Sequence, residues 1–324
     1  LFRSQIMDGR SQTGIVACAS IDDYIKNTIK KHELTREDKE LDRFNHVDYT
    51  NCNTGPIFLT YRHKDEIDDI VKMWTETKTP VYNYKSEDGV SQIVWVVDEK
   101  GISSKLSAIF AKIDYLYIAD GHHRSASAVK VGLKRRQDNP SYTGDEEFNY
   151  FLSVIFPDND LYVMDYNRVV ADLFGNSMDE FISKVSEKFD ITTIDDSSQF
   201  KPKVQRTYGM FLEGKWYKLQ AKEGSFNLND PVERLDVSIL QKNLLKPILG
   251  IDNPRTNPRI DFVGGIRGLE ELERRVKCGM KVAFSMCPTT MDDLMDIANA
   301  GKTMPPKSTW FEPKLQSGIF VHEL

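Results

Sequence analysis

Asp120-Gly121-His122-His123-Arg124 is the most informative stretch of the sequence, because it stands where a buried strand gives way to a helix. The residues before it, 115–119, are aromatic and β-branched, which is typical of a short strand. From Ser125 onward, small apolar residues followed by a basic end are typical of a helix. A strand, one glycine and a helix start together offer free backbone N–H groups and a positive dipole end to an anion. The stretch therefore predicts a phosphate or carboxylate site.

Two interpretations of these five residues stay open. In the first, Asp120, Gly121, His122 and Arg124 bind the phosphates of a nucleotide, with imidazole and guanidinium groups adding positive charge. In the second, Asp120 caps the helix and the histidines are structural groups with satisfied hydrogen bonds. For one such residue the second interpretation is the better one, but five together favour the anion site.

Composition excludes several classes of protein. With 324 residues the chain is long for one core, so we expect two domains or one domain with a large elaboration. The net charge of −6 argues against a nucleic-acid partner, and no apolar run approaches the roughly 20 residues of a membrane span. Four scattered cysteines without a C-x-x-C pair predict reduced thiols in a cytoplasmic protein. The chain opens with Leu1 rather than methionine, so we expect that part of the natural N-terminus is missing.

Strand and helix patterns alternate along the first half of the chain, which predicts an α/β (α+β) fold with a mixed sheet. A junction near Val170 would divide it into domains 1–170 and 171–324. The expected strands are 14–19, 55–61, 115–119 and 282–286, with hairpins at 82–97, 150–164 and 207–219. The expected helices are 64–76, 103–111, 178–189, 237–245, 268–277 and 290–300, with a short helix or extended segment at 21–31.

Segment 304–314 cannot be a helix, because it contains prolines at 305, 306 and 313. Two interpretations are equally open for this loop. It is a structural strap, or it faces the pocket and contacts the ligand through Lys307, Ser308 and Thr309.

A second polar cluster, Lys30 to Thr35, contains His32 and Glu33. A His-Glu pair is common on solvated surfaces and by itself specifies little. Next to an anion site, however, the glutamate would serve as a general base. Glu33, His32 and His123 are therefore the candidate catalytic residues.

The sequence also limits which metals and cofactors the site can use. The His-Glu-x-x-His spacing of zinc peptidases is absent, and so are a Walker loop, a G-x-G-x-x-G turn and a G-x-S-x-G elbow. Magnesium held mainly by phosphate oxygens needs only one carboxylate from the protein, and Asp120 at the strand end is the candidate.

Five pieces of the sequence, taken in order, resemble the domain-of-unknown-function ten-fifteen family, an uncharacterised bacterial and archaeal family. They are Gly14-Ile-Val-Ala, His32-Glu-Leu-Thr35, Gly55-Pro-Ile-Phe-Leu-Thr-Tyr61, Tyr117-Ile-Ala-Asp-Gly-His-His-Arg124 and Met304-Pro-Pro-Lys-Ser-Thr309. The resemblance spans nearly the whole chain, and the last two pieces are specific. The family typically has a lysine where this chain has Leu34, so no role for a lysine is carried over to that position.

The Asp-Gly-His-His-Arg segment also resembles the signature of the ParB/sulfiredoxin-like superfamily and its free serine kinases. This resemblance implies a ParB/sulfiredoxin-like core with a C-terminal α/β elaboration. It implies Glu33 as the hydroxyl-activating base, with Asp120, His122, His123 and Arg124 forming the phosphate-binding turn. The sulfiredoxin branch needs a cysteine beside the turn, and none lies near position 120. The ParB branch needs a helix-turn-helix and a basic face, and the acidic balance of the chain argues against both.

The resulting prediction is a kinase that transfers phosphate from ATP or ADP, with Mg²⁺, to a small hydroxyl-bearing metabolite such as free serine. The alternatives are a nucleotide-binding regulatory module without turnover and a phosphohydrolase. The sequence does not fix the acceptor or the oligomeric state, for which a homodimer is one option.

Overall fold

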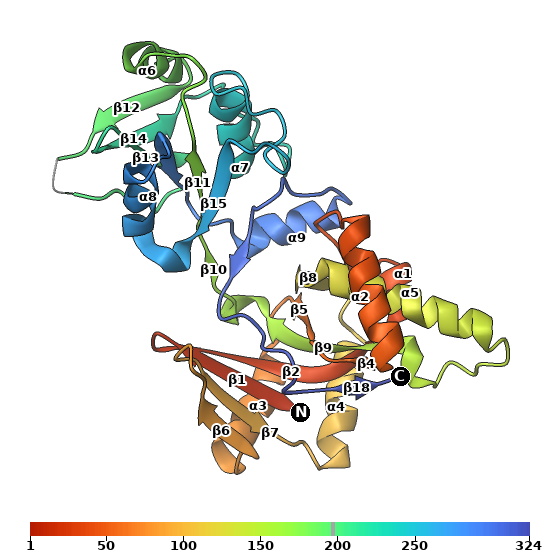
Figure 1. The fold of residues 1–324 in the computed structure, drawn as a ribbon. Helices are drawn as coiled ribbons and strands as arrows, with labels where there is room; N and C mark the ends of the chain where they lie inside the picture. Colours follow the sequence, from red (N-terminus) through yellow and green to blue (C-terminus); the bar gives the residue numbers. More distant parts are fainter. Residues whose placement is uncertain (196–197) are drawn as a thin grey trace. The chain divides into compact units, whose positions relative to one another are not determined.

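The computed structural model describes residues 1–195 and 198–324, which form two compact units. The first unit comprises Leu1–Tyr162 together with Pro313–Leu324, and the second comprises Val163–Glu312. Each unit has its own sheet (Figure 1). The last twelve residues of the chain therefore belong to the unit in which the chain began.

The first unit is built on an eight-stranded sheet with the order β3-β8-β5-β9-β2-β1-β7-β6. The β3/β8 and β5/β9 pairs are parallel and the other neighbours are antiparallel, so the predicted mixed α/β fold is confirmed. The strands are β1 (Phe2–Met7), β2 (Arg10–Ser20), β3 (Ile29–Lys30), β5 (Ile57–Tyr61), β6 (Tyr82–Lys85), β7 (Ser91–Trp95), β8 (Leu116–Asp120) and β9 (Tyr150–Pro157).

Strand β1 is one of the strands that the pattern does not predict, and its polar residues are buried rather than exposed. Arg3 has no exposed surface, and its Nη2 donates a hydrogen bond to Gln92 Oε1 at 2.9 Å. Asp8 and Gly9 join β1 to β2 with φ values of 50° and 76°, which suits a tight hairpin turn. The strand therefore depends on a partner in β7, far away in the sequence.

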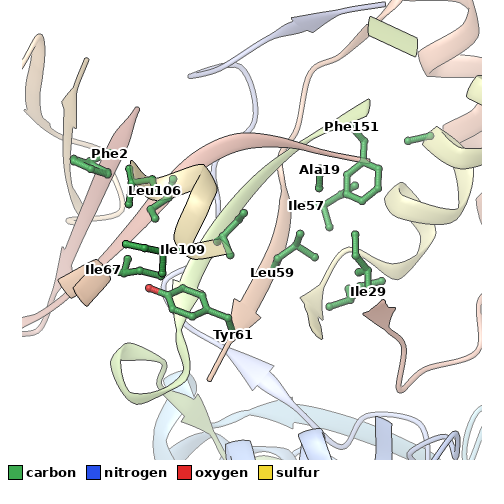
Figure 2. Packing of buried hydrophobic residues seen from close by; sticks show 14 of the residues in the cluster. Phe2, Ala19, Ile29, Ile57, Leu59, Tyr61, Ile67, Leu106, Ile109 and Phe151 are labelled. Carbon is green, nitrogen blue, oxygen red and sulfur yellow. The ribbon is translucent and has the colours of Figure 1, made fainter. Parts of the chain in front are cut away.

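Five helices accompany this sheet in the described part of the first unit. They are α1 (Ile21–Ile25), α2 (Glu37–Thr50), α3 (Asp65–Thr77), α4 (Lys100–Phe110) and α5 (His122–Asp138). Figure 2 shows Leu106 and Ile109 of α4 beside Ile67 of α3 and Tyr61 of β5 in the buried hydrophobic cluster. Ile67 belongs to the apolar stripe that the helical spacing predicts for α3.

Helix α2 was not predicted, because it lacks an apolar stripe. It lies beside α5 (Figure 1) and makes polar contacts with it: Ser127 Oγ donates to the Glu40 carbonyl at 2.8 Å, and Lys130 forms an ion pair with the Glu40 carboxylate. Glu40 is only 9 % exposed. A helix held by buried polar contacts has no hydrophobic periodicity for sequence analysis to detect.

The second unit contains a six-stranded antiparallel sheet with the order β12-β14-β13-β16-β11-β15. The strands are β11 (Tyr166–Val170), β12 (Phe189–Thr193), β13 (Thr207–Leu212), β14 (Lys215–Ala221), β15 (Ile260–Gly264) and β16 (Val282–Ser285). The accompanying helices are α6 (Met178–Ser186), α7 (Asp236–Leu240), α8 (Gly268–Lys277) and α9 (Met291–Asn299). The hairpin predicted at 207–219 is confirmed as β13–β14.

One predicted pairing is wrong. The expected hairpin at 150–164 does not form, because β9 pairs with β2 and β5, whereas β10 (Val163–Met164) pairs with β17 (Trp310–Phe311). The short connection favoured a hairpin, but both edges of β9 are already paired, one with β2 and the other with β5. The chain crosses from the first unit to the second between Tyr162 and Val163.

The end of the chain returns to the first unit through a short pairing of β18 (His322–Glu323) with β4 (Cys52–Asn53). Gly318 N donates to the Thr54 carbonyl at 2.8 Å, and Leu324 N donates to the Asn51 carbonyl at 3.0 Å. Residues 313–324, here called the C-terminal tail, are thus fixed beside the segment that leads into β5.

No helix in the described part of the chain has both the length and the apolar character that crossing a membrane requires.

Candidate functional site

The candidate site is built around the turn between β8 and α5. Asp120 is the last residue of β8, Gly121 has a left-handed conformation with a φ of 98°, and α5 begins at His122. The helix therefore starts three residues earlier than predicted, because Gly121 turns the chain at once. The interpretation that Asp120 caps the helix is wrong: the N-cap is Gly121, and no side chain makes a capping hydrogen bond. The first N–H groups of α5 lack intrahelical acceptors, so an anion can bind to them.

His32 and His122 form a buried pair beside this turn. Their ring centroids are 4.5 Å apart with the planes nearly perpendicular, and their exposed fractions are 2 % and 5 %. Burial lowers the pKa of His122 to about 3, with smaller contributions from the charges of His123 and Lys31. Burial also holds the pKa of His32 well below its usual value. Both rings are therefore neutral near pH 7.

Each ring of the pair has one nitrogen without a hydrogen-bond partner in the described part of the chain: His32 Nδ1 and His122 Nε2. Unsatisfied buried polar atoms are uncommon in folded proteins and are frequent at functional sites. The interpretation that these histidines are fully satisfied structural groups therefore does not hold for those two atoms.

Glu33 lies next to the same turn. Its Oε2 is 3.7 Å from His122 Nδ1, and its side chain is 41 % exposed. Because His122 is neutral, this contact is not an ion pair, and the carboxylate keeps access to solvent and to a ligand. Residues 33 and 122 are thus brought together from two separate parts of the sequence.

His123 joins the two segments. Its Nε2 accepts a hydrogen bond from the Arg36 backbone N–H at 3.0 Å, which ties the loop carrying Glu33 to the first turn of α5. This bond occupies the Nε2 lone pair. The structure therefore gives His123 a positioning contact rather than a free proton-accepting nitrogen.

The Arg124 guanidinium lies between two glycines. Its Nε and Nη2 are 3.2 Å from where a Cβ on Gly121 would be, and its Nη1 is 3.2 Å from where a Cβ on Gly55 would be. Within residues 1–195 and 198–324, no hydrogen bond or ion pair of Arg124 is found. Burial lowers its pKa, while the Asp120 carboxylate opposes that effect. A half-buried cation of this kind is available to an anionic ligand.

Two site residues come from the C-terminal tail: Lys314, the last residue of the segment 304–314 that was expected to face the pocket, and Ser317, and neither was predicted as a site residue by itself. Lys314 Nζ is 3.2 Å from Asp120 Oδ2, and Ser317 Oγ is 2.8 Å from where a Cβ on Gly55 would be. The side chains of Asp120 and Lys314 are 39 % and 46 % exposed. No local pattern could have linked Lys314 to Asp120, because they are 194 positions apart.

The loop residues Lys307, Ser308 and Thr309 belong to the second unit. Lys307 Nζ lies 5.5 Å from the centroid of the Tyr166 ring, and Ser308 Oγ donates to the Pro305 carbonyl at 2.6 Å. The segment contains no helix, as its prolines predict. A contact between these residues and a ligand stays a prediction.

The buried histidine pair predicts a dependence of stability on pH. In the unfolded chain His122 takes up a proton near its ordinary pKa of 6.5, whereas in the folded protein it stays neutral down to about pH 3. The unfolded state binds more protons in this window, so the free energy of unfolding falls as the pH falls, by about 1.4 kcal/mol per unit. We expect His122→Asn to remove this part of the slope between pH values of about 7 and 5 in urea titrations. The same change at the exposed His46 should leave the slope of the parent protein, and an unchanged slope in the His122 variant would contradict the burial argument.

The chain belongs to the family described as "protein of unknown function (DUF1015)", whose model matches residues 2–238. No curated protein matches the chain. Among solved structures, a free serine kinase variant in complex with AMP has 13 % identity and a TM-score of 0.42, with 92 % of this chain and 86 % of that chain covered. A conserved hypothetical protein from Pyrococcus furiosus has 15 % identity, a TM-score of 0.40, and coverage of 94 % and 93 %. SbnI with a C-terminal truncation, from Staphylococcus aureus, has 10 % identity, a TM-score of 0.46, and coverage of 95 % and 87 %.

Proposed function

We propose that this protein is a small-molecule kinase that transfers phosphate from ATP or ADP to a hydroxyl-bearing metabolite, with free serine as the leading candidate. One observation carries the proposal. A solvent-accessible carboxylate, Glu33, lies 3.7 Å from the first residue of a helix whose start is uncapped and holds the guanidinium of Arg124. A base beside an anion site is the arrangement that phosphoryl transfer to a hydroxyl needs.

The phosphate site consists of the α5 N-terminus, Arg124 and Lys314. The helix start offers N–H groups and a positive dipole end, and the guanidinium offers several donors in one plane. Lys314 adds a second positive charge beside the turn. All three contribute stabilisation where negative charge is present or develops, which is the main source of rate enhancement in phosphoryl transfer.

In the proposed reaction, the acceptor hydroxyl oxygen forms a bond to the terminal phosphorus of the nucleotide. The bond between that phosphorus and the bridging oxygen breaks, and the bridging oxygen leaves with ADP or AMP. The hydroxyl proton passes to the Glu33 carboxylate. His123 positions the Glu33 loop through the Arg36 N–H, and the neutral His32 and His122 rings form its buried wall.

Magnesium would bind at this site together with the nucleotide phosphates, rather than to the protein alone. In the described part of the chain, no group of three His, Cys, Asp or Glu residues could hold a metal. Asp120 offers one partly exposed carboxylate, which is enough for an ion whose other ligands are phosphate oxygens and waters. When bound, Mg²⁺ would neutralise phosphate charge.

We also infer a cytoplasmic location. All four cysteines, Cys18, Cys52, Cys278 and Cys287, are free thiols. Unpaired cysteines are typical of proteins from a reducing compartment.

A labelled-nucleotide assay tests the function. The protein is incubated with terminally labelled ATP or ADP and a pool of small metabolites, and products are separated for any new phosphorylated compound. Label in an organic product supports the kinase. Release of inorganic phosphate without an acceptor favours the phosphohydrolase, and nucleotide binding without turnover favours the regulatory module, which has no need of Glu33.

A further prediction concerns Lys307, which we propose contacts an anionic group of the donor or the acceptor. Its backbone is left-handed, with a φ of 60°, and its side chain is exposed. We expect Lys307→Ala to lower kcat/KM without changing the melting temperature. A structural strap would behave in the opposite way, losing melting temperature while the folded protein kept its kinetics. Both quantities should be measured on this variant and on Lys302→Ala, an exposed lysine that pairs with Asp230.

A further inference from the structure

A small cavity of about 60 Å³ adjoins the phosphate turn within the first unit. Its walls come from α2, from the segment between β4 and β5, from α5 and from the C-terminal tail. The polar residues that line it are Arg43, His46, Thr54, Arg124 and Ser317, together with Asn53. On this measure a single water needs about 10–15 Å³, so the space has room for a small polar group such as a carboxylate.

The charges around this cavity have one sign. Two guanidinium groups, Arg43 and Arg124, line it, and no acidic residue is among the described residues that do. Arg43 pairs with its neighbour Asp42 at the surface, with side-chain exposures of 49 % and 59 %. Such an exposed pair is weak and exchanges readily with solvent. Burial is the main cause that lowers the pKa of Arg124, and repulsion by the like charge of Arg43 adds to it.

The backbone around Gly55 allows hydrogen-bond donors to lie close to this cavity. Gly55 has no side chain, and a Cβ there would lie 2.8 Å from Ser317 Oγ and 3.2 Å from Arg124 Nη1. The bond from Gly318 N to the Thr54 carbonyl fixes the tail at this point, and His46 Nε2 is 3.0 Å from Thr54 Oγ1. A hydroxyl and two guanidinium groups therefore line this space.

Arg124 connects the cavity with the phosphate turn. Its Nε and Nη2 edge lies against Gly121, while Nη1 lies against Gly55 and the cavity. One planar guanidinium with five donors can serve two anions on different edges. An anionic group in the cavity would therefore lie one side chain away from the phosphate that is transferred.

We infer that this cavity binds the carboxylate of the phosphate acceptor, through Arg43, Arg124 and Ser317. The substrate class is then a small hydroxy acid or hydroxy amino acid. This inference rests on the proposed kinase function and deepens it. A donor phosphate has the same oxyanion chemistry, but the phosphate turn on the other edge of Arg124 already accounts for it.

Arg124 borders both the cavity and the phosphate turn, so a change at Arg124 would affect both anions. A change at Arg43, which lines the cavity, distinguishes carboxylate binding from phosphate binding. Calorimetric titrations with D-glycerate, L-serine, serinamide, inorganic phosphate and ADP would be made on the parent protein and on Arg43→Met. We expect glycerate or serine to bind the parent at least tenfold more tightly than serinamide does. Arg43→Met should remove most of that preference while changing ADP affinity less than threefold. Ser317→Ala should weaken carboxylate binding by about two- to tenfold, the usual effect of one hydrogen bond.

Asp42→Asn is the matched control, because it releases Arg43 from its neighbour and keeps the guanidinium. It should bind the carboxylate at least as tightly as the parent protein does. Melting temperatures of all three variants show whether each is folded. Equal binding of serine and serinamide by the parent would overturn the inference. So would an Arg43→Met variant that loses ADP or inorganic phosphate in the same proportion, since the cavity would then hold donor phosphate. Binding is measured without turnover, so a carboxylate site found in a protein that transfers no phosphate would refute the kinase and leave the cavity assignment standing.

Discussion

Replacing Glu33 with glutamine should lower turnover by about 10²–10⁴-fold and leave nucleotide affinity nearly unchanged. Glutamine keeps the size of the side chain but cannot accept the hydroxyl proton at neutral pH. The phosphate site is formed by other groups, namely the start of α5 and the side chains of Arg124 and Lys314. The loss should therefore appear in kcat, with little change in the calorimetric affinity for ADP.

The matched control for this variant is Glu37→Gln. Glu37 is the exposed first residue of α2 and lies four positions farther along the same segment. It should keep the turnover of the parent protein within a factor of about two. If Glu33→Gln also kept full turnover, Glu33 would not be the base, and another group would have to accept the hydroxyl proton. If it lost ADP affinity, the carboxylate would be shaping the phosphate site instead.

Replacing Arg124 with alanine should weaken ATP and ADP binding by about 1.5–3 kcal/mol, the range of a charge-assisted contact. The guanidinium has no ion-pair partner in the described part of the chain, so its donors remain for a ligand. Lysine at this position keeps the charge but loses the planar fork, and it should recover only part of the affinity. Calorimetry with both nucleotides measures the change, and an unchanged affinity would contradict the assignment of Arg124 to the phosphate site.

The same position offers a second readout. Burial lowers the pKa of Arg124, which means that the folded protein holds this cation at a cost. Arg124→Met keeps most of the side-chain volume without the charge. We expect its melting temperature to equal or exceed that of the parent, although its nucleotide affinity falls. Arg274→Ala, which removes an exposed pair with Glu271 in α8, is the control that should change neither quantity appreciably. A large loss of stability in Arg124→Met would indicate a structural role.

The local parts of this protein could be predicted from the sequence. A strand, a glycine and a helix around Gly121, the β13–β14 hairpin and the helix-free segment with prolines 305, 306 and 313 all follow from short-range rules. Each depends on backbone geometry or on hydrophobic spacing within a few residues. The sequence also predicted Glu33 and Arg124 as partners, though only as members of two separate motifs.

Only the tertiary structure decided how these parts meet. It set the start of α5 at His122, buried the His32–His122 pair and brought Glu33 to within 3.7 Å of it. It also placed Lys314 and Ser317 at the site from the far end of the chain. Strand β1 and helix α2 escaped prediction for the same reason, because buried polar contacts with distant partners hold them. Such contacts join polar and charged groups that are far apart in the sequence. The residues next to each group in the sequence therefore do not indicate its partner.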